Sequence, residues 1–281
     1  MIESSRNEAI KTLRRIRRTK GTEAVLEGPY LVLEALAAGF RLQPVLATEE
    51  FLASGPGQEV LARLPRRPLL ATSAVLDSLA DADSPRGLIA ACSLPRTDVA
   101  GIHPHGNEIW LYLDRIQDPG NVGALARVAE GLGAAGLVLS PGCADPNHSR
   151  ALRASAGSLL RLPVAIRAEP EAARERFAAT GGRGARWIGL EAHQGSIPLD
   201  ELAPAGGPGV AGAVGAGGAM GVTVVAVGAE GPGLSAATRA QLDVAVTLAL
   251  RGRLESLNVA VAVALVLARL APPAPPSLTP P

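Results

Sequence analysis

The polar side chains that could take part in chemistry gather in three loops, each following a short apolar segment. These loops are Asp114–Asn121, Gly228–Ser235 and Arg251–Asn258. In open parallel α/β sheets, ligands bind outside the carboxyl ends of the strands, so three such loops predict one ligand site at that edge. The chain has no Gly-Lys-Ser or Gly-Lys-Thr phosphate loop, so nucleotide hydrolysis is not indicated.

The second loop reads Gly228-Ala-Glu-Gly-Pro-Gly-Leu-Ser235 and could bind a ligand through its main-chain groups. Its glycines at 228, 231 and 233 allow a flat ligand to approach the main chain closely and leave N–H and C=O groups unhindered. Such a pocket suits an adenine ring held by main-chain hydrogen bonds.

The third loop leads into the most apolar segment of the chain, Val259–Leu267. Ser256 is a good N-cap for a helix there, and Asn258 adds an amide group at the same end. Because this segment is apolar on every face, we expect a helix buried all round. It is too short for a membrane span, which needs ~20 apolar residues, and Arg269 closes it.

A parallel α/β sheet is the element that would bring these loops together. The expected strands are Ile109–Leu113, Leu137–Ser140, Leu162–Ile166, Trp187–Leu190, Val222–Val227 and Val244–Leu250. The expected helices are one capped by Asn121 that runs to Leu132, a small-residue helix at Ser149–Leu160, and an exposed helix at Glu169–Ala178. Residues 203–221 form a glycine-rich insertion or loose loop, and residues 271–281 a proline-rich disordered tail.

Residues 1–95 form a smaller α/β domain, and residues 96–108, which are irregular and polar, form a linker. Strands are expected at Ala24–Tyr30, Gln43–Ala47, Pro68–Ala71 and Leu88–Ser93, and helices at Leu31–Ala38 and Ser73–Ala80. This part contains no nucleophile–base pair and no phosphate loop, which favours a binding module. His103 and His105 in the linker have no further ligands nearby and are ordinary loop histidines.

Residues 1–20 hold seven basic and two acidic side chains. Ile10, Leu13 and Ile16 recur at intervals of three, so this stretch predicts a basic amphipathic helix with one apolar edge. Its charges form either a solvated face or a contact with phosphates, and the stretch alone does not decide between them.

The composition bounds the class of protein. The chain has 281 residues, a formal net charge of +1, 47% hydrophobic and 2% aromatic residues, so we expect a core of Ala, Val and Leu. Cys92 and Cys143 lack metal-ligand spacing, and a disulfide between them has little support. No signal peptide and no membrane span are recognised, which predicts a cytoplasmic location.

Three ordered segments carry a resemblance to a known family. Asp118-Pro-Gly-Asn-Val-Gly-Ala-Leu-Ala-Arg127, Val227-Gly-Ala-Glu-Gly-Pro-Gly-Leu-Ser235 and Glu255-Ser-Leu-Asn-Val259 resemble the motifs of the SpoU RNA ribose 2′-O-methyltransferases, which are α/β-knot (SPOUT) enzymes. Since all three occur in order and at the right spacing, the match is far more specific than any one alone. It covers residues 109–270. The leading domain, with Glu27-Gly28-Pro29, resembles the ribosomal-protein-like RNA-binding domain of many members.

The resemblance implies a trefoil-knotted methyltransferase domain that binds S-adenosylmethionine and works as a homodimer without a metal. The apolar helix after Asn258 would then pack in the knot and at the dimer interface. The implied catalytic residues are Asn121, Arg127, Glu230, Ser256 and Asn258. The implied cofactor-binding residues are Gly228, Glu230, Gly231, Leu248 and Leu257. With the resemblance to an RNA-binding domain, the residues expected to contact RNA are Arg14, Arg15, Arg17, Arg18 and Lys20.

The implied reaction is methyl transfer to a ribose 2′-hydroxyl, most consistent with ribosomal RNA because of the leading domain. Arg127, from either subunit, would anchor phosphate and stabilise the developing alkoxide, since the pKa of arginine is above ~12 and it cannot serve as a base. One departure from the family is Leu248-Ala249-Leu250 where members have Ile-Pro-Met. Alternatives are a transfer-RNA enzyme, an antibiotic-resistance enzyme acting on ribosomal RNA, and a non-catalytic RNA-binding assembly protein.

Overall fold

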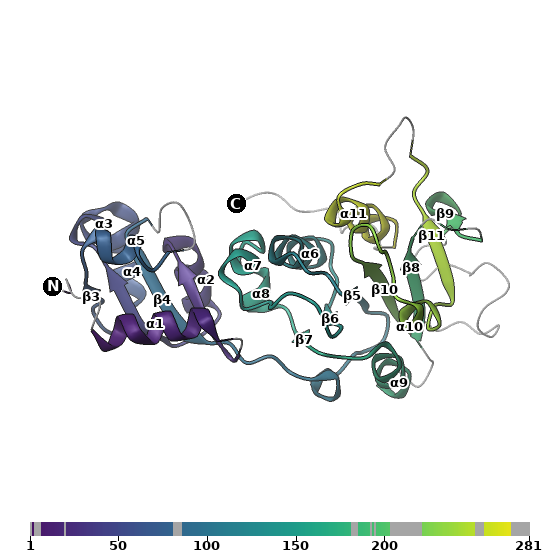
Figure 1. Cartoon of the computed structure of the whole chain (residues 1–281), viewed down its shortest axis with the longest axis horizontal. Coiled ribbons are helices and arrows are strands. Elements are labelled where there is room, and N and C mark those ends of the chain that lie inside the picture. Colours follow the sequence, from purple (N-terminus) through teal and green to yellow (C-terminus); the bar gives the residue numbers. More distant parts are fainter. Residues whose placement is uncertain are drawn as a thin grey trace. The chain divides into compact units, whose positions relative to one another are not determined.

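The structure is a computed structural model that describes most of the chain (Figure 1). The described residues are 2, 7–19, 21–80, 86–180, 185–191, 193, 195–202, 221–250 and 256–270. Lys20, residues 203–220 of the glycine-rich insertion, residues 251–255 of the third polar loop and the tail from 271 to 281, all named above, lie outside them. The described helices include none that combines the length and the apolar composition that crossing a bilayer requires.

The chain divides into two compact units, each built from separate segments. The first unit comprises Met1–Arg96, Val122–Arg127 and Ala144–Arg161, and the second comprises Thr97–Asn121, Val128–Cys143 and Leu162–Pro281. The assignment of separate roles to residues 1–95 and 109–270 stays a prediction.

A four-stranded sheet forms the centre of the first unit, in the order β1-β4-β2-β3. Its strands are β1 (Glu23–Glu27), β2 (Leu42–Ala47), β3 (Leu69–Leu70) and β4 (Leu88–Ser93). β4 runs antiparallel to β1 and β2, whereas β2 and β3 are parallel. A strand is therefore confirmed at each of the four expected places, but the first one ends at Glu27, because Pro29 and Tyr30 begin the helix that follows.

Five helices of the first unit surround this sheet. They are α1 (Glu8–Arg18), α2 (Pro29–Ala37), α3 (Glu49–Ala53), α4 (Gly55–Arg63) and α5 (Ser73–Asp77). The amphipathic α1 is confirmed, since Ile10, Leu13 and Ile16 are buried against the sheet. The sequence reasoning missed α3 and α4, although Thr48 and Ser54 cap them with their hydroxyls.

The single helix expected at Ser149–Leu160 was wrong, because the structure has two short helices there. These are α7 (Ser149–Ala154) and α8 (Ser158–Arg161). Ala156 and Gly157 between them have φ values of 47° and 86°, a left-handed conformation that ends an α-helix. In the same unit, the Val122–Arg127 segment of α6 (Pro119–Gly131) lies so close to α7 that a Cβ at Gly123 would overlap the carbonyl oxygen of Ala151.

A seven-stranded sheet forms the second unit, and every pairing in it is parallel. The strand order is β7-β6-β5-β10-β8-β11-β9 (Figure 1). The bounds are β5 (Ile109–Asp114), β6 (Gly136–Leu139), β7 (Val164–Ala165), β8 (Ala185–Leu190), β9 (Ile197–Pro198), β10 (Val222–Gly228) and β11 (Val244–Thr247). The predicted fold class, α/β with a parallel sheet after a smaller domain, is confirmed.

The second unit also contains α9 (Pro170–Thr180), α10 (Ala236–Arg239), α11 (Val259–Leu270) and the 3-10 turns Val99–Gly101 and Leu199–Glu201. The expected core of Ala, Val and Leu is confirmed, since these residues make up most of the buried side chains. Four of the seven aromatic residues nevertheless pack together in one cluster of this unit. Phe177 contacts Trp110 and Trp187 edge-on, and Trp187 contacts Tyr112 in a tilted arrangement, with the centroids of each pair 5.2–6.2 Å apart. Since Phe177 belongs to α9, this helix is only partly exposed.

Helix α11 differs from its prediction on one face. Val263, Val266 and Leu267 are fully buried, as expected. Val261 and Leu265, however, are 51% and 45% exposed. The all-apolar sequence therefore leaves an uncovered apolar stripe in the single chain instead of a helix buried all round.

Candidate active site

The sheet order brings two of the three polar loops side by side. β5 and β10 are neighbours, and Gly228 at the end of β10 is the register partner of Asp114 at the end of β5. Because both strands run in the same direction, the loops that follow them leave the sheet at the same edge. β11, which precedes the third loop, lies two strands from β10 with β8 between them.

The first loop ends in helix α6, whose start differs from the prediction. Asp118, not Asn121, is the N-cap: its carboxylate accepts the N–H groups of Gly120 and Asn121, at 2.5 and 3.2 Å. Pro119 occupies the first helical position, where no N–H is needed. Asn121 therefore stands inside the first turn, and its side chain is available for contacts outside the helix.

Asn121 makes those contacts with the other two loops. Its Nδ2 donates to Oε1 of Glu230 at 3.2 Å, and its Oδ1 accepts from Nδ2 of Asn258 at 3.5 Å. Three residues predicted for catalysis, from three separate loops, thus meet at one point near the surface. A carboxylate and two amides there can orient a hydroxyl-bearing ligand.

Asn258 also starts helix α11, a role that the sequence reasoning gave to Ser256. The Oδ1 of Asn258 accepts from the N–H of Ala260 at 3.0 Å, and its carbonyl accepts from that of Ala262 at 3.0 Å. Ser256 lies two residues before the cap and is exposed. Because the cap is Asn258, the position of that side chain follows directly from the start of α11.

The second loop, Gly228–Ser235, is called the glycine-rich loop below, and it folds into a tight turn that requires glycine for a steric reason. A Cβ at Gly228 would overlap the backbone of Gly233 and Leu234, because the loop folds back on itself. The N–H of Gly233 donates to the carbonyl of Ala229 at 2.9 Å, and φ at Gly231 and Gly233 is positive. These glycines therefore allow a main-chain turn that other residues could not form, as expected of a backbone that approaches a ligand.

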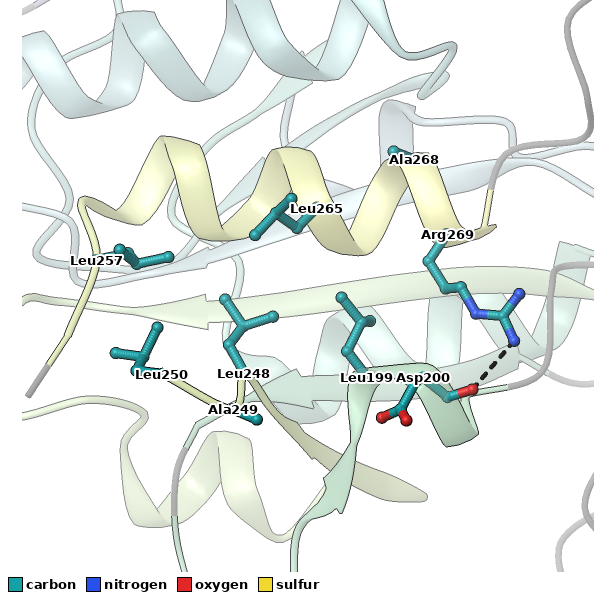
Figure 2. Close-up of a pocket in the computed structure, with 9 residues that line it drawn as sticks. All are labelled: Leu199, Asp200, Leu248, Ala249, Leu250, Leu257, Leu265, Ala268 and Arg269. Carbon is teal, nitrogen blue, oxygen red and sulfur yellow. Dashed lines mark hydrogen bonds between the residues drawn. The ribbon is translucent and has the colours of Figure 1, made fainter. Parts of the chain in front are cut away.

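Two of the predicted cofactor-binding residues, Leu248 and Leu257, line one pocket of about 600 Å³ (Figure 2). Their side chains face it together with Leu199 and with Leu265 of α11. Its volume lies within the range of small-molecule sites, roughly 300–1,000 Å³. Gly228, Glu230 and Gly231 are not among its lining residues.

The sequence did not predict the residues that form the remaining wall of this pocket. Arg269 closes one end and donates from Nη2 to the carbonyl of Asp200 at 3.2 Å (Figure 2). Leu199 and Asp200 belong to a 3-10 turn far from α11 in the sequence, and no motif marks them. Only the strand order, which places β9 beside β11, brings that turn to the pocket.

Arg127 lies on the exposed surface of α6, six residues after Asn121. Six residues advance an α-helix by about 9 Å and rotate it so that the two side chains leave about 120° apart. Arg127 and Asn121 therefore point away from different faces of one helix.

The basic residues of α1 differ in how accessible they are. Arg15 and Arg18 are exposed, and Arg15 pairs with Glu23 at 2.8 Å. Arg14 is half-buried, with Nη2 3.4 Å from the hydroxyl of Ser78. Arg17, in contrast, forms an ion pair with Glu27. Contact of all these residues with RNA stays a prediction.

The ion pair of Arg17 has a structural function in the first unit. The side chain of Glu27 is only 2% exposed, and its other oxygen accepts from Arg153 of α7 at 2.9 Å. A buried carboxylate needs such partners, and removing one of them costs about 3–5 kcal/mol. Glu27, which precedes Gly28 and Pro29, thus links β1 to α1 and α7.

Neither cysteine has the environment of a nucleophile. Cys143, beside the first loop, donates from Sγ to the carbonyl of Leu113 at 3.1 Å, and burial raises the pKa of its thiol. Burial raises the pKa of Cys92 to about 11. Within the described residues, both are free thiols, and no group of three or more His, Cys, Asp or Glu side chains could hold a metal ion.

Comparison with known proteins matches residues 108–268 to the SpoU rRNA Methylase family. The 23S rRNA (guanosine(2553)-2′-O)-methyltransferase RlmP of Bacillus subtilis is 27% identical over 273 residues, which is 96% of this chain and 98% of that protein. An uncharacterized tRNA/rRNA methyltransferase of Synechocystis sp. is 31% identical over 274 residues, 95% of this chain and 91% of that protein.

Among solved structures, the SpoU methyltransferase AviRb from Streptomyces viridochromogenes, in complex with AdoMet, has the same fold. It is 24% identical with a TM-score of 0.78, covering 94% of this chain and 97% of that one. These similarities extend over nearly the whole length of each chain and therefore include the N-terminal part as well as the parallel sheet.

Proposed function

We propose, from the premise that the chain belongs to the SpoU rRNA methylase family, that it methylates a ribose 2′-hydroxyl of large-subunit ribosomal RNA. Family membership confirms the predicted enzyme class, an RNA methyltransferase, and its cofactor, S-adenosylmethionine. The observation that carries the proposal is the contact of Asn121 with Glu230 and Asn258, since each residue comes from a different motif.

The residues present fit this cofactor. Leu248 and Leu257 line an apolar pocket of suitable volume, and the backbone at Gly228 can be approached closely because no Cβ fits there. The bound sulfonium supplies a good leaving group for its methyl. The loss of proline in Leu248-Ala249-Leu250 leaves the main-chain groups of this segment in place.

Asn121, Glu230 and Asn258 orient the ribose in this proposal. Because Nδ2 of Asn121 is held by Glu230 and its Oδ1 by Asn258, the amide plane of Asn121 is fixed before RNA arrives. A preorganised polar cluster of this kind lowers the barrier by holding reacting atoms in place. Ser256, exposed and two residues before Asn258, completes the proposed cluster.

Arg127 would anchor the phosphate of the target nucleotide and stabilise the developing alkoxide. The guanidinium suits this role since it stays charged and can bind phosphate with two N–H groups. We assign it to the site of a partner subunit because it leaves α6 on a different face from Asn121.

The homodimer that this requires is supported by α11. Val261, Leu265 and Ala268 recur at intervals of four and three, so they form one exposed apolar stripe on the helix. Continuous apolar stripes on single chains mark association surfaces. We propose that a second copy of the chain covers this stripe, next to the pocket lined by Leu265, and that the domain is trefoil-knotted as in its family.

Ribosomal RNA is the favoured substrate because the similarity to the Bacillus subtilis 23S rRNA enzyme covers 98% of that protein. The runners-up are a transfer-RNA enzyme and a resistance enzyme, which share every motif. A non-catalytic RNA-binding protein is disfavoured, since the three polar residues are present and in contact. A ribosomal substrate also places the enzyme in the cytoplasm.

The test is methylation with tritiated S-adenosylmethionine, offering undermodified ribosomal and transfer RNA side by side. We expect label in one ribosomal nucleotide, at a linkage that resists alkali because its 2′-oxygen is methylated. Label in transfer RNA only would overturn the substrate and keep the chemistry. Absence of label in both, together with absence of cofactor binding by calorimetry, would favour the non-catalytic alternative.

A further inference from the structure

Asp114 is a buried acid that the proposed mechanism does not use. It is the last residue of β5 and is 2% exposed. Its Oδ2 accepts the N–H of Ser235 at 2.6 Å, while Oδ1 lies 3.5 Å from the hydroxyl of Ser140 and 3.4 Å from Nε of Arg115. A carboxylate is expensive to bury unless it is fully paired, so this position needs an explanation.

The carboxylate and the backbone of Asp114 hold the two ends of the glycine-rich loop. The loop leaves the sheet at Gly228, the register partner of Asp114, and returns at Ser235, whose N–H binds the Asp114 carboxylate. Ser235 is also the N-cap of α10, so the returning chain is fixed in direction. Glu230 lies within this loop, and its position therefore depends on both attachments.

Asp114 also helps to hold the start of the loop that leads to Asn121. The next residue, Arg115, has a φ of 55°, a left-handed conformation that a residue with a Cβ adopts only when its surroundings hold it. Its N–H donates to Oγ of Ser140 at 2.9 Å, and the same hydroxyl reaches Asp114 at 3.5 Å. One small network thus supports the start of both loops.

From these contacts we propose that Asp114 is a positioning residue that holds Glu230 in hydrogen-bonding position to Asn121. The position of its carboxylate oxygen matters most, because the hydrogen bond from the Ser235 N–H fixes the far end of the glycine-rich loop to the end of β5. This inference rests on the proposed function only in giving Asn121 and Glu230 a role at the ribose.

A double-mutant cycle tests this proposal through the coupling of Asp114 to Glu230. We expect Asp114→Ala to lower the methylation rate about 100-fold, since a displacement of about 1 Å can cost that much. In a Glu230→Ala background, the same change should cost less than about threefold, because the acceptor that it positions against Asn121 is already lost. Independent, multiplied losses in the double variant would overturn the proposal.

Conservative substitutions separate geometry from charge. Asp114→Asn keeps an acceptor for the Ser235 N–H and should recover most of the rate lost in Asp114→Ala. Asp114→Glu keeps the charge but displaces the acceptor and should recover little. If Asp114→Glu restores the methylation rate and Asp114→Asn does not, the charge of Asp114 matters and the positioning proposal fails. Asp114→Glu, which is also expected to lose rate, takes the place of the alanine variant in the cycle if Asp114→Ala does not fold.

Asp243→Ala is the matched control, because Asp243 also lies in the second unit and accepts a backbone N–H, that of Trp187, at 2.8 Å. The effect of Asp243→Ala should multiply with that of Glu230→Ala. Amide hydrogen exchange gives a readout that needs no RNA: Asp114→Ala should speed exchange in 228–235, and Asp243→Ala should not. If the wild type methylates no RNA, the proposed function fails, and unchanged exchange in this loop would separately overturn the positioning role.

Discussion

The side-chain amide of Asn121 donates a hydrogen bond to the carboxylate of Glu230, 3.2 Å away and 109 residues later in the chain. No local preference places these groups together, because they follow different strands. Their contact results from the neighbouring positions of β5 and β10 in the sheet. The site therefore depends on the sheet topology. Single substitutions in its loops should lower activity strongly while leaving the fold intact.

Replacement of Asn121 by aspartate is the mildest way to break that contact. Asn121→Asp keeps the shape but brings two carboxylates together, which repel each other. We expect the methylation rate at saturating substrates to fall about 100-fold or more, with cofactor affinity by calorimetry nearly unchanged. Asn107→Asp, at an exposed residue before β5, should behave as wild type. Equal losses of methylation rate and cofactor affinity would contradict the assignment of Asn121 to the part of the site that binds RNA.

The glycine-rich loop predicts a different phenotype. In Gly228→Ala, the added Cβ overlaps the backbone of Gly233 and Leu234, so the loop must shift. We expect cofactor binding to weaken at least about tenfold in calorimetry, with the fold retained by circular dichroism. Gly131→Ala is the control, because a Cβ there meets no atom within 4 Å. Wild-type affinity in Gly228→Ala would show that this backbone does not form part of the cofactor site.

The contact network of the site was foreseeable in part from the sequence. The motifs identified Asn121, Glu230 and Asn258, and the parallel sheet explains why they meet. The choice of cap was not foreseeable, because several residues near each helix start could accept the same N–H groups. Asp118 and Asn258 form these caps, in place of Asn121 and Ser256.

Features that depend on distant parts of the chain were less predictable. The pocket wall at Leu199 and Arg269 follows from the pairing of β9 with β11, which no local pattern encodes. The break between α7 and α8 lies at Ala156, whose left-handed conformation is unusual for alanine. The sequence also could not indicate that the apolar α11 keeps Val261 and Leu265 exposed in the single chain.

That exposed stripe leads to a prediction about assembly. Leu265→Glu places a charge where we propose a partner chain to pack, and burying it there would be costly. We expect light scattering to report a dimer for the wild type and mostly monomer for this variant. Leu69→Glu is a matched control, since Leu69 is 47% exposed in β3 of the other unit. A monomeric wild type, or a dimer unaffected by Leu265→Glu, would contradict the proposed interface.

The thiol of Cys92 predicts a change of stability with pH. Burial raises its pKa in the folded protein from about 9 to about 11. Below about pH 9 both folded and unfolded chains keep the proton, whereas between about pH 9 and about pH 11 the unfolded chain loses it first. Stability should therefore fall over this range by about 2 kcal/mol more in the wild type than in Cys92→Ala.

Denaturant unfolding at several pH values measures that difference. Cys92→Val, which also lacks an ionisable group, should show the same reduced pH dependence as Cys92→Ala, whatever its effect on stability at neutral pH. Identical pH dependence in the wild type and both variants would mean that the Cys92 thiol does not contribute.

Mixed dimers can decide which subunit supplies Arg127. Arg127→Ala and Asn121→Ala should each abolish methylation while binding the cofactor normally. If Arg127 serves the partner's site, a heterodimer of the two variants contains one complete site, with Asn121 from one chain and Arg127 from the other. Random mixing on co-expression should then restore about a quarter of wild-type activity, because half of the dimers are heterodimers with one active site of two. Arg66→Ala, at an exposed arginine of the first unit, should stay fully active in the same assay. An inactive mixture of correctly formed heterodimers would place Arg127 and Asn121 of the same chain in one site.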